Sequence, residues 1–388
     1  MYDNIVAHKI AEQTTSTPLT NFSVIGPDTL IDRLNLNWRE KDLPERVRTK
    51  HVHRLHPYLG KFIPQLAEIF LRKFQPQLVY DPFCGSGTTL VEAKALGTHS
   101  IGVDIAQFNV LISRAKTLNY KIPLLEQEIG DILFRFSMAY PTVVETNNEY
   151  LQNWFSEQAR SELLRYLALI ENYTYRDLLK VILSRAARSA RLVTHYDLDF
   201  PKKPQTSPYE CYKHGRICQP VQEARRFLMR YSLDTMKRVR AFHQLAPRGA
   251  VDVLHGDARN IRLPHGIDMV FTSPPYLGLI DYHEQHRYSY ELLGLQTNEG
   301  EEIGSATKGV SNGAKQEYIE SINGVLSHTR NHMTRGGIMC IVVHDKYNLY
   351  DPAKVGFKSI GRVERHVNRR TGRRNHAFHE SILIWKKT

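Results

Sequence analysis

Two short turns hold the residues best suited to chemistry, and the later one reads Ser273-Pro274-Pro275-Tyr276. Each proline fixes its φ angle and lacks a backbone N–H group, so the turn presents a hydroxyl and carbonyl oxygens with little freedom. The aromatic ring offers a flat face on which a planar ligand can stack; a core aromatic is the alternative interpretation. Because residues 268–271, of which 269–271 are apolar, read as a strand and precede this turn, we expect the turn at the carboxyl end of that strand.

The earlier turn spans residues 81–89 and reads Asp-Pro-Phe-Cys-Gly-Ser-Gly-Thr-Thr. Glycines two residues apart let the backbone approach a ligand closely, and the helix that follows points free N–H groups at it. No lysine follows Gly87, so this is not a phosphate-binding P-loop. Asp104 ends the next apolar run, about 20 residues on, where an acid that binds a ribose diol is expected. An ordinary turn with a surface aspartate is the alternative.

These turns belong to a pattern of alternating strands and helices. The sequence predicts a helix over 63–74. It then predicts a strand over 78–81, a helix over 88–96 and a strand over 100–104, and these three elements form a βαβ unit. Further strands are expected at 251–254, 268–272, 338–343 and 381–385. The fold class is therefore α/β, with a mainly parallel sheet flanked by helices.

The alternation of strands and helices is interrupted in the middle of the chain, and this interruption predicts the domain organisation. Residues 51–120 and 248–388 would form the α/β domain, whereas 121–247 carry long amphipathic patterns, such as 162–190 and 221–245, that indicate a helical insertion. Residues 1–50 are polar and irregular, and we interpret them as a lead-in that contacts a partner or covers the core.

Composition limits the partners and the compartment. The chain has 388 residues and a formal net charge of +12, which favours a polyanionic partner, either nucleic acid or an anionic membrane surface. No run approaches the roughly 20 apolar residues of a membrane span, and the N-terminus does not resemble a secretory signal. Four cysteines make no disulfide framework, which favours a reducing cytoplasm.

A short segment of the insertion raises the question of a metal. Cys211, His214 and Cys218 have the spacing C-x2-H-x3-C, which could hold zinc, but a fourth ligand is missing nearby. We therefore interpret them as ordinary loop residues and expect no metal.

Residues 81–89 resemble the cofactor motif DPFxGSGTT of amino-methylating DNA methyltransferases, and residues 273–276 resemble their catalytic motif, SPPY. Residues 56–64 resemble a preceding segment that packs against the methionine end of the cofactor. The resemblance implies a Rossmann-like fold that binds S-adenosylmethionine, with Asp104 at the ribose and Asp257 near the adenine amine. The cofactor-binding residues that it implies are Tyr58, Lys61, Phe62, Asp81, Phe83, Cys84, Gly85, Ser86, Gly87, Thr88, Asp104 and Asp257.

The same resemblance implies that Ser273, Pro274, Pro275 and Tyr276 are catalytic, and serine at the first position is typical of the N4-cytosine branch. Methylation at carbon 5 would need a nucleophilic thiolate, and this turn has no cysteine. Three alternatives remain: an N6-adenine DNA methyltransferase, an RNA methyltransferase that uses the same pocket, and a non-catalytic nucleic-acid-binding protein with a degenerate methyltransferase fold.

The implied substrate is duplex DNA, whose target base must be flipped out of the stack to reach such a pocket. The partners implied are double-stranded DNA and a cognate restriction endonuclease, without a membrane, in a prokaryotic, nucleoid-associated and cytoplasmic setting. Basic residues of the insertion and of a C-terminal run are expected to contact phosphates, although a solvated helix face is the alternative for any one of them. These residues are Arg185, Arg188, Arg191, Arg369, Arg370, Arg373 and Arg374.

Overall fold

A seven-stranded sheet organises the part of the chain that the computed structural model describes, residues 18–138, 142–278, 281–367 and 378–388. Its order is β5-β2-β1-β6-β7-β9-β8, and β9 runs antiparallel to both of its neighbours while the other pairings are parallel. The strands are β1 Leu78–Asp81, β2 His99–Asp104, β5 Val251–His255, β6 Ile267–Thr272, β7 Met333–Val343, β8 Phe357–Val367 and β9 Phe378–Lys387. The expected α/β fold with a mainly parallel, Rossmann-like sheet is confirmed.

The direction of winding changes between β1 and β6. From β1 the chain adds β2 and then β5 on one side, whereas β6, which pairs with β1 through Val79 and Met269, starts the other half of the sheet. In open α/β sheets, ligands bind outside the carboxyl ends of the strands at such a switch point. Both chemically promising turns follow these two strands, so the topology brings them to one place.

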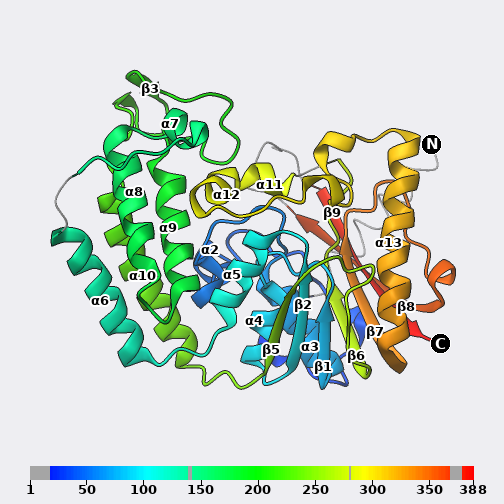
Figure 1. Ribbon diagram of the computed structural model, residues 1–388. Coiled ribbons are helices and arrows are strands. Elements are labelled where there is room, and N and C mark those ends of the chain that lie inside the picture. Colours follow the sequence, from blue (N-terminus) through cyan, green and yellow to red (C-terminus); the bar gives the residue numbers. More distant parts are fainter. Residues whose placement is uncertain (1–17, 139–141, 279–280, 368–377) are drawn as a thin grey trace.

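Helices cover both faces of the sheet (Figure 1). Alternation along β7 shows the two cores: Met339 and Ile341 belong to the cluster that includes helix α13 (Asn312–His332), whereas Cys340 and Val342 belong to the cluster that includes α3 (Pro64–Phe74). A strand buried on both faces reads as an uninterrupted apolar run, as this segment does. Helices α4 (Thr88–Ala95) and α5 (Gln107–Thr117) follow β1 and β2.

Between α5 and β5 the chain leaves the sheet and forms a helical body beside it, which we call the insertion (Figure 1). Its helices are α6 Ile122–Met138, α7 Glu149–Trp154, α8 Glu157–Ile170, α9 Arg176–Ala190 and α10 Arg225–His243, and a hairpin of β3 (Tyr209–Cys211) and β4 (Arg216–Cys218) lies between α9 and α10. The amphipathic pattern over 162–190 is divided at 171–175, where the backbone N–H groups of Thr174 and Tyr175 donate to the Glu128 carboxylate at 2.8 and 3.0 Å.

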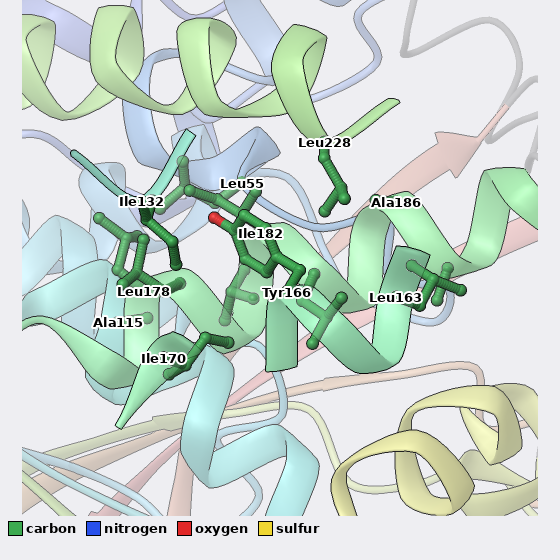
Figure 2. Packing of buried hydrophobic residues seen from close by; sticks show 14 of the residues in the cluster. Leu55, Ala115, Ile132, Leu163, Tyr166, Ile170, Leu178, Ile182, Ala186 and Leu228 are labelled. Carbon is green, nitrogen blue, oxygen red and sulfur yellow. The ribbon is translucent and has the colours of Figure 1, made fainter. Parts of the chain in front are cut away.

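The insertion shares its hydrophobic core with the α/β domain (Figure 2). Tyr166, Ile182 and Leu228 come from the insertion, and the same cluster contains Leu55 and Ala115, all with at most 1% of their surface exposed. The area these side chains remove from water is therefore shared between the two parts, and neither part buries its apolar face alone.

The lead-in and the sheet edge complete the fold. Residues 18–50 cover the core, because Leu36, Trp38 and Leu43 lie in the same cluster as α3. The remaining elements are η1 Phe22–Val24, η2 Ile31–Arg33, α2 Glu45–Arg48, η3 His51–Arg54, α11 Tyr282–Gln285, α12 Arg287–Leu293, η4 Glu299–Glu301, η5 Ala306–Lys308 and η6 Ala353–Val355. Within the described ranges, no helix combines the length and the apolar character needed to cross a membrane.

Candidate active site

A cleft opens at the carboxyl ends of β1, β2 and β6, and it measures about 850 Å³ when the space open to solvent is included. Both turns contribute to its wall, since Gly85 and Ser273 line the same cleft. The other predicted residues in the wall are Tyr58, Lys61, Phe62, Phe83, Cys84, Ser86, Thr88, Asp104, Asp257 and Pro275. Of the predicted set, Asp81, Gly87, Pro274 and Tyr276 are described but are not part of this wall.

Asp81, buried at the end of β1, connects the two turns through hydrogen bonds. Its carboxylate accepts hydrogen bonds from the hydroxyl of Thr89, at 2.7 Å, and from that of Thr272, at 2.6 Å. Thr89 lies in the first turn of α4, and Thr272 ends β6, the strand before the second turn. Burial raises the pKa of Asp81 to about 6, against the effect of these hydrogen bonds. Asp81 therefore fixes the two turns relative to one another, although the sequence predicted cofactor binding for it.

Gly85 and Gly87 are required by conformation and by space. Both have left-handed backbones, with φ values of +50° and +77°. A Cβ atom at Gly85 would lie 3.0 Å from the Tyr58 hydroxyl oxygen, and one at Gly87 would lie 2.8 Å from Ser113 Oγ. A side chain at either position would strain the loop.

Asp104 lies at the end of β2, beside this loop. Oδ2 accepts from the Gly85 N–H at 2.8 Å, and Oδ1 accepts from the N–H of Ala106 at 2.9 Å and from Asn109 Nδ2 at 3.1 Å. Burial raises the pKa of the Asp104 carboxyl to about 6. A carboxylate in this place can bind a sugar hydroxyl at the cleft while it holds the loop.

An aromatic wall faces the glycine loop. The Tyr58 ring is stacked with the rings of Tyr282, at 5.8 Å between centroids, and His286, at 5.4 Å, and its hydroxyl accepts from Asn109 Nδ2 at 3.1 Å. Lys61 Nζ donates to the His53 carbonyl at 3.0 Å, and burial lowers the pKa of this lysine to about 8. Such a wall suits a flat, positively charged ligand.

Asp257 lies across the cleft, after β5. Its carboxylate is paired with Arg259, whose Nη2 lies 2.6 Å from Oδ2. Although partial burial raises the pKa of Asp257, the hydrogen bonds from Arg259 hold it below its ordinary value. The group is therefore a charged acceptor at neutral pH.

The second turn is held by its neighbours. Ser273 Oγ donates to the Val342 carbonyl at 2.9 Å, and the Pro275 carbonyl accepts from the Tyr318 hydroxyl at 2.9 Å. The Tyr276 hydroxyl donates to Glu380 Oε1 at 3.4 Å. These hydrogen bonds hold the turn at the edge of the cleft.

The thiols of Cys84, in the glycine loop, and Cys340, in β7, are poor nucleophiles. Burial raises the pKa of both Cys84 and Cys340 well above that of an ordinary cysteine, so both remain protonated at neutral pH. A thiolate is the form that attacks, and neither environment produces one.

Some wall residues gave no signal in the sequence. They come from α5 and from the segments around α11 and η4, whose spacing resembles no motif, and their proximity to the cleft depends on the tertiary fold. These residues are Ile105, Ala106, Asn109, Tyr282, Glu301, Glu302 and Ile303.

The insertion arginines predicted to contact phosphate are held within the protein. Arg185 Nη1 lies 2.6 Å from Asp234 Oδ2, and Arg188 pairs with Asp199. Arg191 is 3% exposed, with its guanidinium 4.4 Å from the centre of the Tyr288 ring. Phosphate contact would require these interactions to open, and a DNA-binding role for these three arginines stays a prediction. The other predicted arginines, Arg369, Arg370, Arg373 and Arg374, lie outside the described residues.

The sequence and the fold of this chain are similar to those of known methyltransferases. A family model for DNA methylases, named for N6 and N4 methyltransferases, matches residues 61–114. Type II methyltransferase M.MjaII of Methanocaldococcus jannaschii is 35% identical over 89% of this chain and 82% of that protein. Type II methyltransferase M.MvaI of Kocuria varians is 26% identical over 76% of this chain and 68% of that protein. A solved structure of the rRNA methyltransferase aviRa from Streptomyces viridochromogenes aligns with a TM-score of 0.36 and 11% identity, over 88% of this chain and 96% of that one.

Proposed function

Because this chain belongs to the DNA methylase family of N6 and N4 methyltransferases, whose cofactor is S-adenosylmethionine, we propose that it methylates N4 of cytosine. The substrate would be a short specific site in duplex DNA. The observation that carries the proposal is that the glycine loop and Ser273 line one cleft. A methyl donor held by the first can then face an amine held by the second.

The hydrogen bonding of Ser273 suits an amine substrate. A serine hydroxyl has one hydrogen to donate and two lone pairs to accept with. The hydrogen is committed to the Val342 carbonyl, so Oγ can only accept from a ligand in the cleft. An exocyclic amine is a poor nucleophile because its lone pair is delocalised into the ring. Acceptance of one amine hydrogen by Ser273 Oγ would help direct that lone pair at the methyl carbon. The family resemblance gives the second hydrogen to the carbonyl of Pro274, which follows Ser273 but lies outside the cleft wall.

The transfer needs no covalent enzyme intermediate. When bound, the cofactor would supply an electrophilic methyl group on a sulfonium, and positioning of the amine in line with it would be the main source of rate. As the bond from nitrogen to the methyl carbon forms, the sulfur–carbon bond would break to leave a neutral thioether, and the methylated nitrogen would release one proton to solvent. The protonation of Cys84 and Cys340 supports this route over attack by a thiolate. The aromatic wall at Tyr58 and Tyr282 and the carboxylates around the cleft favour the positive sulfonium.

Duplex DNA would reach the cleft by base flipping, with the insertion as the recognition region. Helix α10 offers exposed cations for phosphates, namely Arg225, Arg226, Arg230 and Lys237. We propose that they replace the inward-facing arginines of α9 in that role. A cognate restriction endonuclease would be the natural partner of such an activity, in the cytoplasm of a prokaryotic cell.

The test is to express the full chain in a host that lacks N4-methylcytosine and to digest the host DNA to nucleosides. Mass spectrometry should detect N4-methylcytosine. Ser273→Ala should reduce it about 100-fold or more, the effect of losing one acceptor that acts in the transition state. Cofactor affinity, measured by calorimetry, should stay within about twofold.

Ser359→Ala is the matched control, because Ser359 lies exposed on the edge strand β8. It should leave the methylation level unchanged. N6-methyladenine in place of N4-methylcytosine would refute the base assignment while leaving the pocket intact. If the chain binds the cofactor but the host DNA contains neither modified nucleoside, DNA methylation itself would be refuted.

A further inference from the structure

The hairpin of the insertion gathers four groups that bind soft metals. Cys211 ends β3, Cys218 ends β4, His214 lies in the turn between them, and His195 lies on the segment that follows α9. The sulfur and nitrogen atoms of these four residues, the Cys–His cluster, all lie within 4.8 Å of one another. His195 is the fourth ligand that the sequence spacing alone did not supply.

The distances within the Cys–His cluster fit one tetrahedral ion. Cys218 Sγ and Cys211 Sγ lie 3.5 and 3.6 Å from His214 Nδ1, and Cys211 Sγ lies 3.9 Å from His195 Nδ1. Metal bonds of about 2.3 Å to sulfur and 2.0–2.1 Å to nitrogen put tetrahedral ligands about 3.3–3.8 Å apart. We propose that the Cys–His cluster is a structural zinc site. Two thiolates and two imidazoles in this geometry select zinc among the common divalent ions.

The backbone prepares this arrangement. The N–H groups of His214 and Gly215 donate to the Cys211 carbonyl at 3.0 and 2.8 Å, and Gly215 takes a left-handed φ of +61° that closes the turn. The N–H of His195 donates to the Tyr209 hydroxyl at 3.0 Å, which ties the preceding segment to β3. Four protein ligands close the coordination sphere, as in structural rather than catalytic zinc sites.

The segment that would be stabilised has few other means of holding its shape. Residues 191–224 connect α9 to α10, and the short hairpin is the regular structure described there. Within this segment, Val221 and Ala224 join the shared hydrophobic core, whereas residues 192–220 belong to none of the clusters found among the described residues. Small units without a core need a disulfide or a metal, and Cys211 and Cys218 are not disulfide-bonded.

Two other clusters of potential ligands do not offer the same site. In the cluster of His51, His53 and Glu92, the Lys50 ammonium already lies 2.8 Å from the Glu92 carboxylate, so the place of a cation is taken. Asp281, His283 and Glu302 give three hard or mixed ligands, and Glu302 is engaged with His283 at 2.5 Å. Neither set provides thiolates.

The experiment measures metal in the purified full-length chain by mass spectrometry of the elements. We expect about one zinc per chain, and replacement by Co²⁺ should give the absorption of thiolate-bound tetrahedral cobalt. Cys211→Ser and His195→Gln should each lower the zinc content at least tenfold. His243→Gln, which changes an exposed histidine at the end of α10, should retain it.

Chelation of the wild-type chain provides a test that needs no variant. Removal of zinc should speed proteolytic cleavage within residues 191–224 at least tenfold, and cofactor affinity should stay within about twofold. A chain that binds the cofactor but holds no zinc would overturn the proposal, as would zinc that persists in Cys211→Ser. A mass two hydrogens lower under non-reducing conditions, which indicates a Cys211–Cys218 disulfide, would also overturn it.

Discussion

Asp104→Asn isolates the contribution of one negative charge to cofactor binding. The substitution keeps the size of the side chain at the end of β2 and removes its carboxylate. The wild-type carboxylate offers about four lone-pair sites. Three donors already occupy it, namely the Gly85 N–H, the Ala106 N–H and Asn109 Nδ2. About one site therefore remains for a ribose hydroxyl.

That count sets the expected magnitude. One hydrogen bond to a charged acceptor contributes about 1.5–3 kcal/mol. At about 1.4 kcal/mol for each factor of ten, Asp104→Asn should weaken cofactor binding about 10- to 150-fold. Removal of a two-bond diol clamp would cost more, so the size of the effect reports how many hydroxyls the carboxylate holds.

Calorimetry with S-adenosylmethionine at pH 8 measures this loss, with Asp252→Asn as the matched control. Asp252 is exposed on the neighbouring strand β5 and lies outside the cleft wall. The pH profile adds a second readout. Burial raises the pKa of Asp104 to about 6, so the accepting carboxylate is lost as pH falls through that value. Wild-type affinity should therefore fall there, and Asp104→Asn should show a smaller fall, because the buried Asp81 still titrates near that pH. Unchanged affinity in Asp104→Asn at pH 8 would refute the ribose assignment.

Three further substitutions test the frame around the cleft. Thr272→Val removes a hydrogen-bond donor from the buried Asp81 carboxylate, so urea unfolding at pH 8 should show a free energy of unfolding about 1–3 kcal/mol lower. An unchanged value would mean that this hydrogen bond contributes nothing to stability. Ile182→Ala, in the shared core, should cost about 2–5 kcal/mol in the same assay, against less than about 0.5 for the exposed Leu233→Ala; equal costs would contradict the described packing. Gly85→Ala places a Cβ atom on a residue with a left-handed backbone, beside the aromatic wall, so calorimetry should show cofactor binding weakened about tenfold or more. Wild-type affinity in this variant would mean that the loop accommodates the side chain without strain.

The parts of the fold that the sequence predicted are those with local signatures. The strand that ends at Asp81 and the strand before Ser273 are short apolar runs followed by turns of unusual composition, so their positions in the chain were clear. Their adjacency in the sheet follows from topology, and the hydrogen bond between Asp81 and Thr272 could not be read from residues so distant in sequence.

The parts that the sequence missed depend on tertiary contacts or lack periodicity. Strand β8 is an edge strand, and most of its side chains are exposed or half-buried. It therefore has no apolar run from which the sequence could predict a strand. His195 joins Cys211 only because the segment after α9 folds back onto β3. The arginines of α9 look like a basic face in the sequence, yet acidic partners such as Asp234 come from another helix.

Helix α5 has two contrasting faces. On one, Ser113 Oγ donates to the Gly85 carbonyl at 2.8 Å, and Lys116 Nζ donates to the Ser86 carbonyl at 2.7 Å. On the other, Phe108 and Ile112 pack in the core that it shares with the insertion. If a bound duplex displaced the insertion, helix α5 would move with it, and the glycine loop that is hydrogen-bonded to α5 would move as well. Thermodynamic linkage then makes the effect reciprocal: whatever factor the duplex imposes on cofactor affinity, the cofactor must impose on duplex affinity.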